Sequence, residues 1–116
     1  MKKGIAEIDP KTAHAVRTFL AKVSGQYNYL GAILFGSRAR RNHRPDSDAD
    51  VAVLLRGQRD QFLDTKLALA DIAYDVLLET GVLIQPLPVW ENEWEHPESY
   101  SNPALLRSIN REGVKL

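Results

Sequence analysis

Residues 29–55 decide the fold, and they have the sequence YLGAILFGSRARRNHRPDSDADVAVLL. The run 29–35 is short and apolar and stops at a glycine, which is typical of a buried strand. Residues 36–48 are polar and contain Gly, Asn and Pro, so they must include a loop. The run 51–55 is apolar again and predicts a second buried strand. Two strands joined by a polar loop are therefore expected at the centre of the protein.

Helices are expected on both sides of this strand pair. Asp9 is suited to an N-cap and Pro10 to the first helical position, so together they predict a helix over about 10–24. Apolar residues recur at helical spacing through 59–79, and Gly81 is suited to follow the end of a helix. This second pattern predicts the longest helix of the chain.

A third strand and a last helix complete the expected order. Residues 82–89 predict the strand, but Pro86 and Pro88 have no N–H to donate, so it must lie at a sheet edge or end early. Asn102 followed by proline repeats the cap signal and predicts a short helix to about Asn110. The order α-β-β-α-β-α predicts an α+β fold of α/β-like character, with a small mixed sheet packed against helices.

Composition limits the classes of function. The 116 residues are 44% hydrophobic and 26% charged, which fits one globular domain over residues 1–116. Fifteen basic and fifteen acidic side chains cancel, which argues against binding nucleic acid by bulk charge. Without cysteine there are no disulfides, cysteine-bound zinc or thiol nucleophiles. No apolar run suits a membrane span or a secretory signal, so we expect a cytoplasmic protein.

Two features of residues 36–50 suggest a phosphate and metal site. Asp48 and Asp50 lie two apart at the start of a strand, so both carboxylates point to one face and repel each other unless a cation such as Mg²⁺ lies between them. The alternative is an acidic strand entry that faces water. Gly36 and Ser37 follow a strand and are suited to holding a phosphate, although a plain strand-ending turn has the same residues.

The third feature is positive charge between these two positions. Arginine recognises phosphate through its two-pronged guanidinium, and the alternative is a solvated basic loop. The residues concerned are Arg38, Arg40, Arg41, His43 and Arg44. A phosphate-holding turn beside a carboxylate pair suits phosphoryl-type transfer, in which metal ions neutralise the phosphates.

The run Gly36-Ser37-Arg38-Ala39-Arg40, followed by Ser47-Asp48-x-Asp50, resembles the DNA polymerase β-type nucleotidyltransferases. Within them it is most similar to the minimal nucleotidyltransferases. The neighbouring elements agree with the family in order, so the resemblance covers a core over about 10–89 and leaves 90–116 as a C-terminal extension. It implies the nucleotidyltransferase fold and transfer of a nucleoside monophosphate from ATP or another triphosphate to a hydroxyl. It implies that Gly36, Ser37 and Arg40 bind the nucleotide, and that Asp48 and Asp50 are catalytic and bind Mg²⁺ or Mn²⁺. It also implies an antitoxin whose partner is a HEPN-domain toxin, modified on a tyrosine in some members.

The sequence departs from the family pattern at two places. Arg41 stands where the family often has glycine. Active members also carry a third acidic residue on a later strand, and the matching strand 82–89 has none. Gln85 is its only polar side chain, so it is the expected occupant, although glutamine is uncharged and a poor base. Other acids that might replace the missing one are Asp75, Glu79, Glu91 and Glu93.

Three hypotheses follow for function. The first is an enzyme that modifies its toxin, and the second is an impaired module that neutralises its partner by binding alone. The third and weakest is a small RNA-binding domain that uses the Arg38–Arg44 loop. Residues 90–98 hold both tryptophans among four glutamates, so they form either a capped turn whose rings cover the core or a docking patch for the partner.

Overall fold

The computed structural model describes residues 3–4 and 8–116. Within these residues, five strands form one mixed sheet in the order β1-β5-β2-β3-β4. The strands are β1 (Lys3–Gly4), β2 (Tyr29–Phe35), β3 (Ala49–Leu55), β4 (Ile84–Trp90) and β5 (Val114–Lys115). β2 is antiparallel to β3, and β4 is parallel to β3. The predicted small mixed sheet is therefore confirmed.

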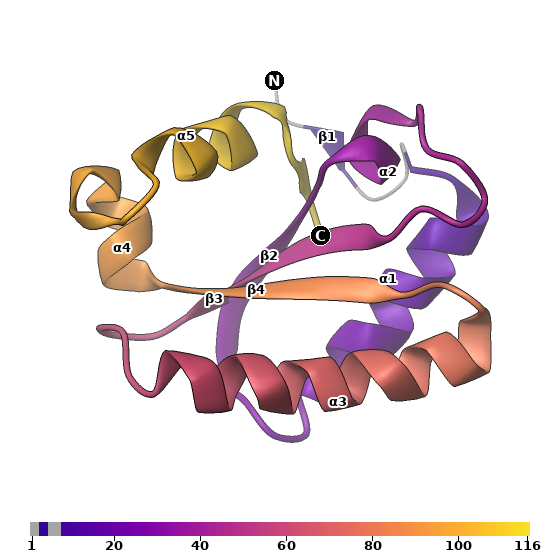
Figure 1. The fold of residues 1–116 in the computed structure, drawn as a ribbon, viewed down its shortest axis with the longest axis horizontal. Helices are drawn as coiled ribbons and strands as arrows, with labels where there is room; N and C mark the ends of the chain where they lie inside the picture. Colours follow the sequence, from indigo (N-terminus) through magenta and orange to yellow (C-terminus); the bar gives the residue numbers. More distant parts are fainter. Residues whose placement is uncertain (1–2, 5–7) are drawn as a thin grey trace.

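Helices cover both faces of this sheet (Figure 1). They are α1 (Pro10–Val23), α2 (Ser37–Arg40), α3 (Phe62–Thr80), α4 (Glu91–Glu95), the 3₁₀ helix η2 (Pro97–Ser99) and α5 (Pro103–Glu112). α1 and α3 share one core cluster with strand side chains such as Leu34 and Val53. α5 packs on the opposite face, against Ile33 and Ala52. Because strand side chains alternate, each strand serves both layers.

Local signals place most element ends where they were expected. The Asp9 carboxylate accepts a hydrogen bond from the Thr12 N–H at 3.1 Å, as an N-cap does, and α1 begins at Pro10. α3 ends at Gly81, whose φ of +77° is the left-handed conformation that glycine adopts without strain. β4 lies at the edge of the sheet, as its two prolines require.

Residues 90–116, which the sequence predicted to be a C-terminal extension, pack against the sheet and contribute a strand to it. Leu106 and Ile109 of α5 are almost completely buried, and Val114 pairs with Leu34 of β2. Gly113 makes this return possible, because a Cβ at this position would overlap the side chain of Ile33 and the Ile109 carbonyl. Residues 90–116 therefore supply one helical layer and part of the sheet.

None of the helices in residues 8–116 combines the length and the apolar character needed to cross a membrane.

Candidate functional site

Neighbouring strands bring Asp48, Asp50 and Gln85 together. The parallel register of β3 and β4 pairs Asp50 with Gln85. The Gln85 Nε2 atom donates a hydrogen bond to Asp48 Oδ2 at 3.0 Å. Strand alternation turns these side chains to the face opposite α1 and α3. The structure therefore places Gln85 beside the carboxylate pair.

The negative charges of Asp48 and Asp50 are not fully balanced by nearby positive groups. Burial raises the pKa of the Asp50 carboxyl above its ordinary value, and the nearby charge of Asp48 raises it further. Arg40 acts in the opposite direction but does not cancel the other two effects. A cation bound between the two carboxylates would relieve this repulsion.

Gly36 brings the turn after β2 against the Asp50 carboxylate. Its φ of +75° lies in the left-handed region, and a Cβ added there would overlap Asp50 Oδ2. The register also pairs Phe35 with Asp50 across β2 and β3. Only glycine therefore lets backbone and carboxylate approach this closely, and Ser37 opens α2 directly after it.

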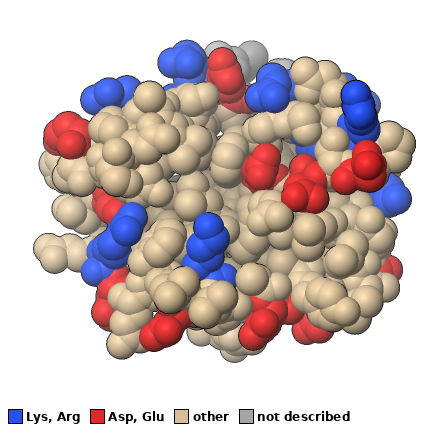
Figure 2. Space-filling view, viewed as in Figure 1, with Lys and Arg blue, Asp and Glu red and all other residues tan. Residues whose placement is uncertain are grey.

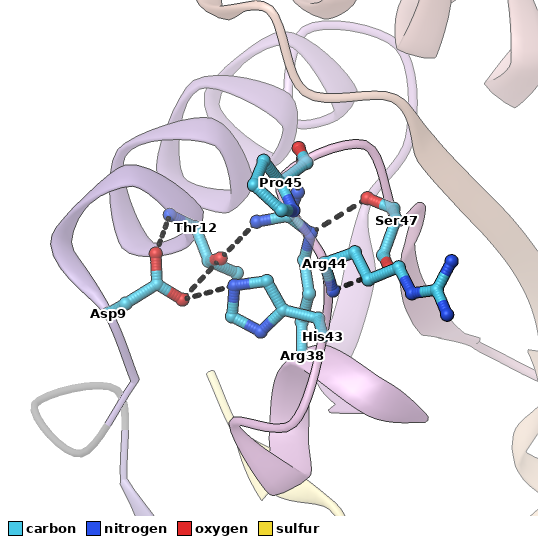
Figure 3. A network of polar contacts seen from close by, with 7 residues as sticks. All are labelled: Asp9, Thr12, Arg38, His43, Arg44, Pro45 and Ser47. Atoms are coloured by element: carbon cyan, nitrogen blue, oxygen red, sulfur yellow. Dashed lines mark hydrogen bonds and ion pairs between the residues drawn. The ribbon is translucent and has the colours of Figure 1, made fainter.

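Arg38 is buried inside the fold, so the prediction that it belongs to a phosphate-facing basic loop is wrong. Its side chain is only 2% exposed. Its Nε donates to the Ser47 carbonyl at 2.9 Å, its Nη1 to Thr12 Oγ1 at 2.8 Å and its Nη2 to the Pro45 carbonyl at 3.2 Å (Figure 3). Arg38 thus fastens the loop that carries Asp48 to the start of α1.

The same network includes His43 and Asp9. His43 Nε2 lies 3.5 Å from Asp9 Oδ1 (Figure 3). Burial alone would raise the pKa of the Asp9 carboxyl, but hydrogen bonds from Thr12 and the nearby positive groups outweigh it and lower that pKa. Arg40, Arg41 and Arg44, by contrast, are exposed. The basic loop therefore keeps three of its four arginines.

Residues 20–85 match a family model described as "Polymerase beta, Nucleotidyltransferase". This match spans more than half of the chain and includes Gly36, Asp48, Asp50 and Gln85. The chain belongs to the polymerase beta nucleotidyltransferase family. A comparison with curated proteins finds no match.

Two solved structures resemble this nucleotidyltransferase domain in fold. One is a Sulfolobus solfataricus protein described as a nucleotidyltransferase, with 16% identity and a TM-score of 0.53, covering 97% of this chain and 90% of its own. The other is a toxin-antitoxin structure with AMP-PNP, with 18% identity and a TM-score of 0.59, covering 88% of this chain and 69% of its own. Both confirm the predicted nucleotidyltransferase fold.

The two carboxylates fit a magnesium ion that takes some of its ligands from the protein and the others from a nucleotide and water. Mg²⁺ is commonly held by one or two carboxylates, with substrate phosphates and water supplying the other oxygens. Asp48 and Asp50 supply two carboxylates, and the repulsion between them favours a cation. Within residues 3–4 and 8–116, no group of three or more His, Asp or Glu side chains is arranged to hold a metal.

The alternative acids lie away from this pair or are used elsewhere. Asp75 and Glu79 belong to α3, which covers the opposite face, and Glu79 pairs with Lys22 at 2.9 Å. Glu91 accepts a hydrogen bond from the Gly57 N–H at 2.8 Å. Glu93 accepts from Arg59 Nε at 2.8 Å and from the Trp90 N–H. Gln85, by contrast, contacts Asp48 directly.

A cavity of about 190 Å³ adjoins the site between α2 and α5. Gly36 and Arg40 form one wall, and Leu105, Ile109 and Glu112 form part of the other. Gly36 also lies against the Asp50 carboxylate, so the cavity adjoins the carboxylate pair, although neither aspartate lines it. No spacing in the sequence ties α5 to residues 36–50, so its position beside this cavity could not be predicted.

Residues 90–98 form a capped turn that covers the core, as one of the two interpretations expected. Trp90 is 4% exposed, and Trp94 packs against the second core cluster. Glu91 and Glu93 make the internal contacts described above. Of the four glutamates, only Glu95 and Glu98 are exposed. The alternative interpretation, an acidic docking patch, is therefore left with two of its four glutamates on the surface.

Acidic and basic groups are interspersed over the face seen in Figure 2, with no continuous basic field. Of the arginines in the RNA-binding hypothesis, Arg38 is buried and Arg40, Arg41 and Arg44 are exposed.

Proposed function

We propose that this chain is a minimal nucleotidyltransferase acting as the antitoxin of a HEPN-domain toxin. It would bind ATP or another nucleoside triphosphate with Mg²⁺ or Mn²⁺ and transfer the nucleoside monophosphate to a hydroxyl of that toxin. The observation that carries the proposal is the approach of Gly36 to the carboxylate pair, within a chain of the polymerase beta nucleotidyltransferase family. The resemblance to a toxin-antitoxin structure supports the partner. We place the protein in the cytoplasm.

Each residue of the site has a role in this proposal. Gly36 and Ser37 hold the triphosphate, because the glycine leaves the backbone open to close approach. Arg40 is exposed and lies at the cavity, where its guanidinium can pair with a phosphate. Asp48 and Asp50 bind the metal, which neutralises phosphate charge when it is bound. The nucleoside would lie against the cavity wall formed by Leu105 and Ile109, because the Glu112 carboxylate on that wall repels phosphate, and the phosphates would lie on the side of Gly36 and Arg40.

The reaction forms one bond to phosphorus and breaks another. The acceptor oxygen bonds to the α-phosphorus, and the bond from that phosphorus to the β-phosphate bridging oxygen breaks, so pyrophosphate leaves. The acceptor hydroxyl also loses its proton. Gln85 cannot take that proton, so it passes to solvent water. Loss of a positioned base costs about 10²–10⁴-fold in rate, so slow transfer is expected.

A labelling experiment tests this proposal. ATP labelled at the α-phosphate is incubated with Mg²⁺, the protein and its co-purified partner. Label should appear on the partner and should be lost with Asp48→Asn together with Asp50→Asn. Asp46→Asn is the matched control, because Asp46 lies in the same loop and is exposed. Equal labelling by the double variant would exclude the transfer mechanism.

The uncharged Gln85 favours a second candidate, a module that neutralises its partner by binding alone. In that case the toxin would remain neutralised when both aspartates are replaced by asparagine, and no label would be transferred. Neutralisation that is lost with the double variant would exclude this second candidate.

A further inference from the structure

One face of α3 exposes large apolar side chains that the fold does not use. The residues are Leu63, Leu67, Tyr74 and Leu78, with exposed fractions of 64%, 56%, 58% and 69%. Their spacing of four, seven and four residues lines them up along the helix. Soluble proteins seldom leave such a row uncovered unless it is an interaction site. We call these four residues the α3 stripe.

The α3 stripe is separate from the packing that holds α3 in place. Leu69, Ile72 and Val76 lie on the inner side of the helix, each less than 5% exposed, in the first core cluster. The stripe also lies on the layer of α1 and α3, whereas Asp48 and Asp50 face the other side of the sheet. A protein docked on the stripe therefore leaves the candidate nucleotide site open.

A row of acids runs along one flank of the stripe. The members are Asp64, Asp71, Asp75 and Glu79, whose spacing of seven, four and four residues follows the same helical period. All four are exposed, and Glu79 is partly neutralised by Lys22 at 2.9 Å. In Figure 2 acidic atoms recur along the lower edge, where α3 runs in Figure 1.

This charge pattern selects between possible occupants. If a second copy paired its α3 antiparallel to the first about a two-fold axis, the same flanks would meet and the acidic rows would repel each other. An anionic membrane surface would also be repelled. A helix with its own apolar row and a flank of Lys or Arg would bury the stripe and pair with the acids.

We propose that the α3 stripe is the docking surface for a basic amphipathic helix of a partner protein. This surface goes beyond the proposed transfer reaction and does not depend on it. It also moves the expected partner contact away from residues 90–98, where two of the four glutamates are used internally.

Two synthetic peptides test the proposal. Both are helical, about 18 residues or five turns long, with leucines at the spacing of the stripe. One carries Lys along its flanks and the other Glu. Calorimetry should show binding of the Lys peptide only, and amide exchange should slow in α3. The affinity should fall as salt is raised.

Variants locate the contact. Leu67→Gln with Tyr74→Gln should weaken binding of the Lys peptide by at least about tenfold, because two central contacts are lost. Leu30→Gln is the matched control, because Leu30 is 42% exposed and belongs to β2 rather than to α3. Circular dichroism confirms that the variants fold, and their Mg²⁺-dependent nucleotide binding should equal that of the wild type.

Other results would overturn the proposal. These are no binding of the Lys peptide, equal binding of both peptides, or binding that the double variant leaves unchanged. Concentration-dependent dimerisation of the wild type that the double variant abolishes would assign the stripe to a second copy. None of these results bears on nucleotide binding, so this proposal and the proposed function fail separately.

Discussion

Arg38 offers a demanding test of how the structure holds the candidate site. Replacing Arg38 with methionine keeps a side chain of similar length but removes its hydrogen-bond donors. Three hydrogen bonds disappear, to Thr12, Pro45 and Ser47. The loop that carries Asp48 then loses its fastening to α1.

The structure sets the size of the effect. A hydrogen bond that involves a charged group contributes about 1.5–3 kcal/mol. The Pro45 and Ser47 carbonyls lie near the surface and regain water, and Thr12 keeps its bond to Asp9 at 2.6 Å. We therefore expect a loss of about 3 kcal/mol rather than the full sum. For a domain of this size that lowers Tm by about 12 °C.

Thermal unfolding followed by circular dichroism measures this loss. Arg44→Met is the matched control, because Arg44 lies in the same loop with an exposed side chain. The control should stay within about 2 °C of the wild type, as surface substitutions usually do. An Arg38→Met protein as stable as the control would refute the structural role of Arg38.

Three further predictions concern the carboxylate pair. Because the folded-state pKa of Asp50 is raised above its ordinary value of 3.8, the ionised carboxyl disfavours folding as pH rises. Asp50→Asn should therefore raise Tm near neutral pH without metal, and the gain should vanish below that value in a pH series of melting curves. Gly36→Ala should lower the free energy of unfolding by at least about 1 kcal/mol more than Gly57→Ala does, because both glycines have positive φ but an added Cβ meets a neighbour, Asp50, at Gly36 alone. Equal losses in thermal melts would contradict that overlap. Gln85→Asp should lower stability without metal through repulsion by Asp48, yet speed Mg²⁺-dependent transfer by at least about tenfold in the labelling assay. An unchanged rate would show that the third carboxylate is not what limits transfer.

Periodicity along the chain predicted the main elements because their signals are local. The apolar run 29–35 and the capped helix beginning at Pro10 appear in the structure with nearly the expected bounds. Gln85 was expected near the pair because the family resemblance points to the strand 82–89, where it is the only polar side chain, and the structure places it beside Asp48. Two-residue strands such as Val114–Lys115 have no periodic signal, so the return of the chain end to the sheet was missed.

The type of a residue alone predicted its role in the site less well than periodicity predicted the helices and strands. Arginine in a loop after a glycine suggests phosphate, yet Arg38 is buried because three acceptors converge on it. The backbone explains another departure from the family pattern. Arg41 adopts a φ of +59°, the conformation that glycine takes most easily, so the arginine at this position has a strained backbone. Contacts between distant segments decide such cases.

Calorimetric titration with a non-hydrolysable ATP analogue tests the central claim most directly. The wild type and Asp46→Asn should bind the analogue in the presence of Mg²⁺ and lose that binding when the metal is removed. The protein with Asp48→Asn and Asp50→Asn should not bind it under either condition. Binding that is independent of Mg²⁺ and equal in the double variant would contradict the assignment of this carboxylate pair.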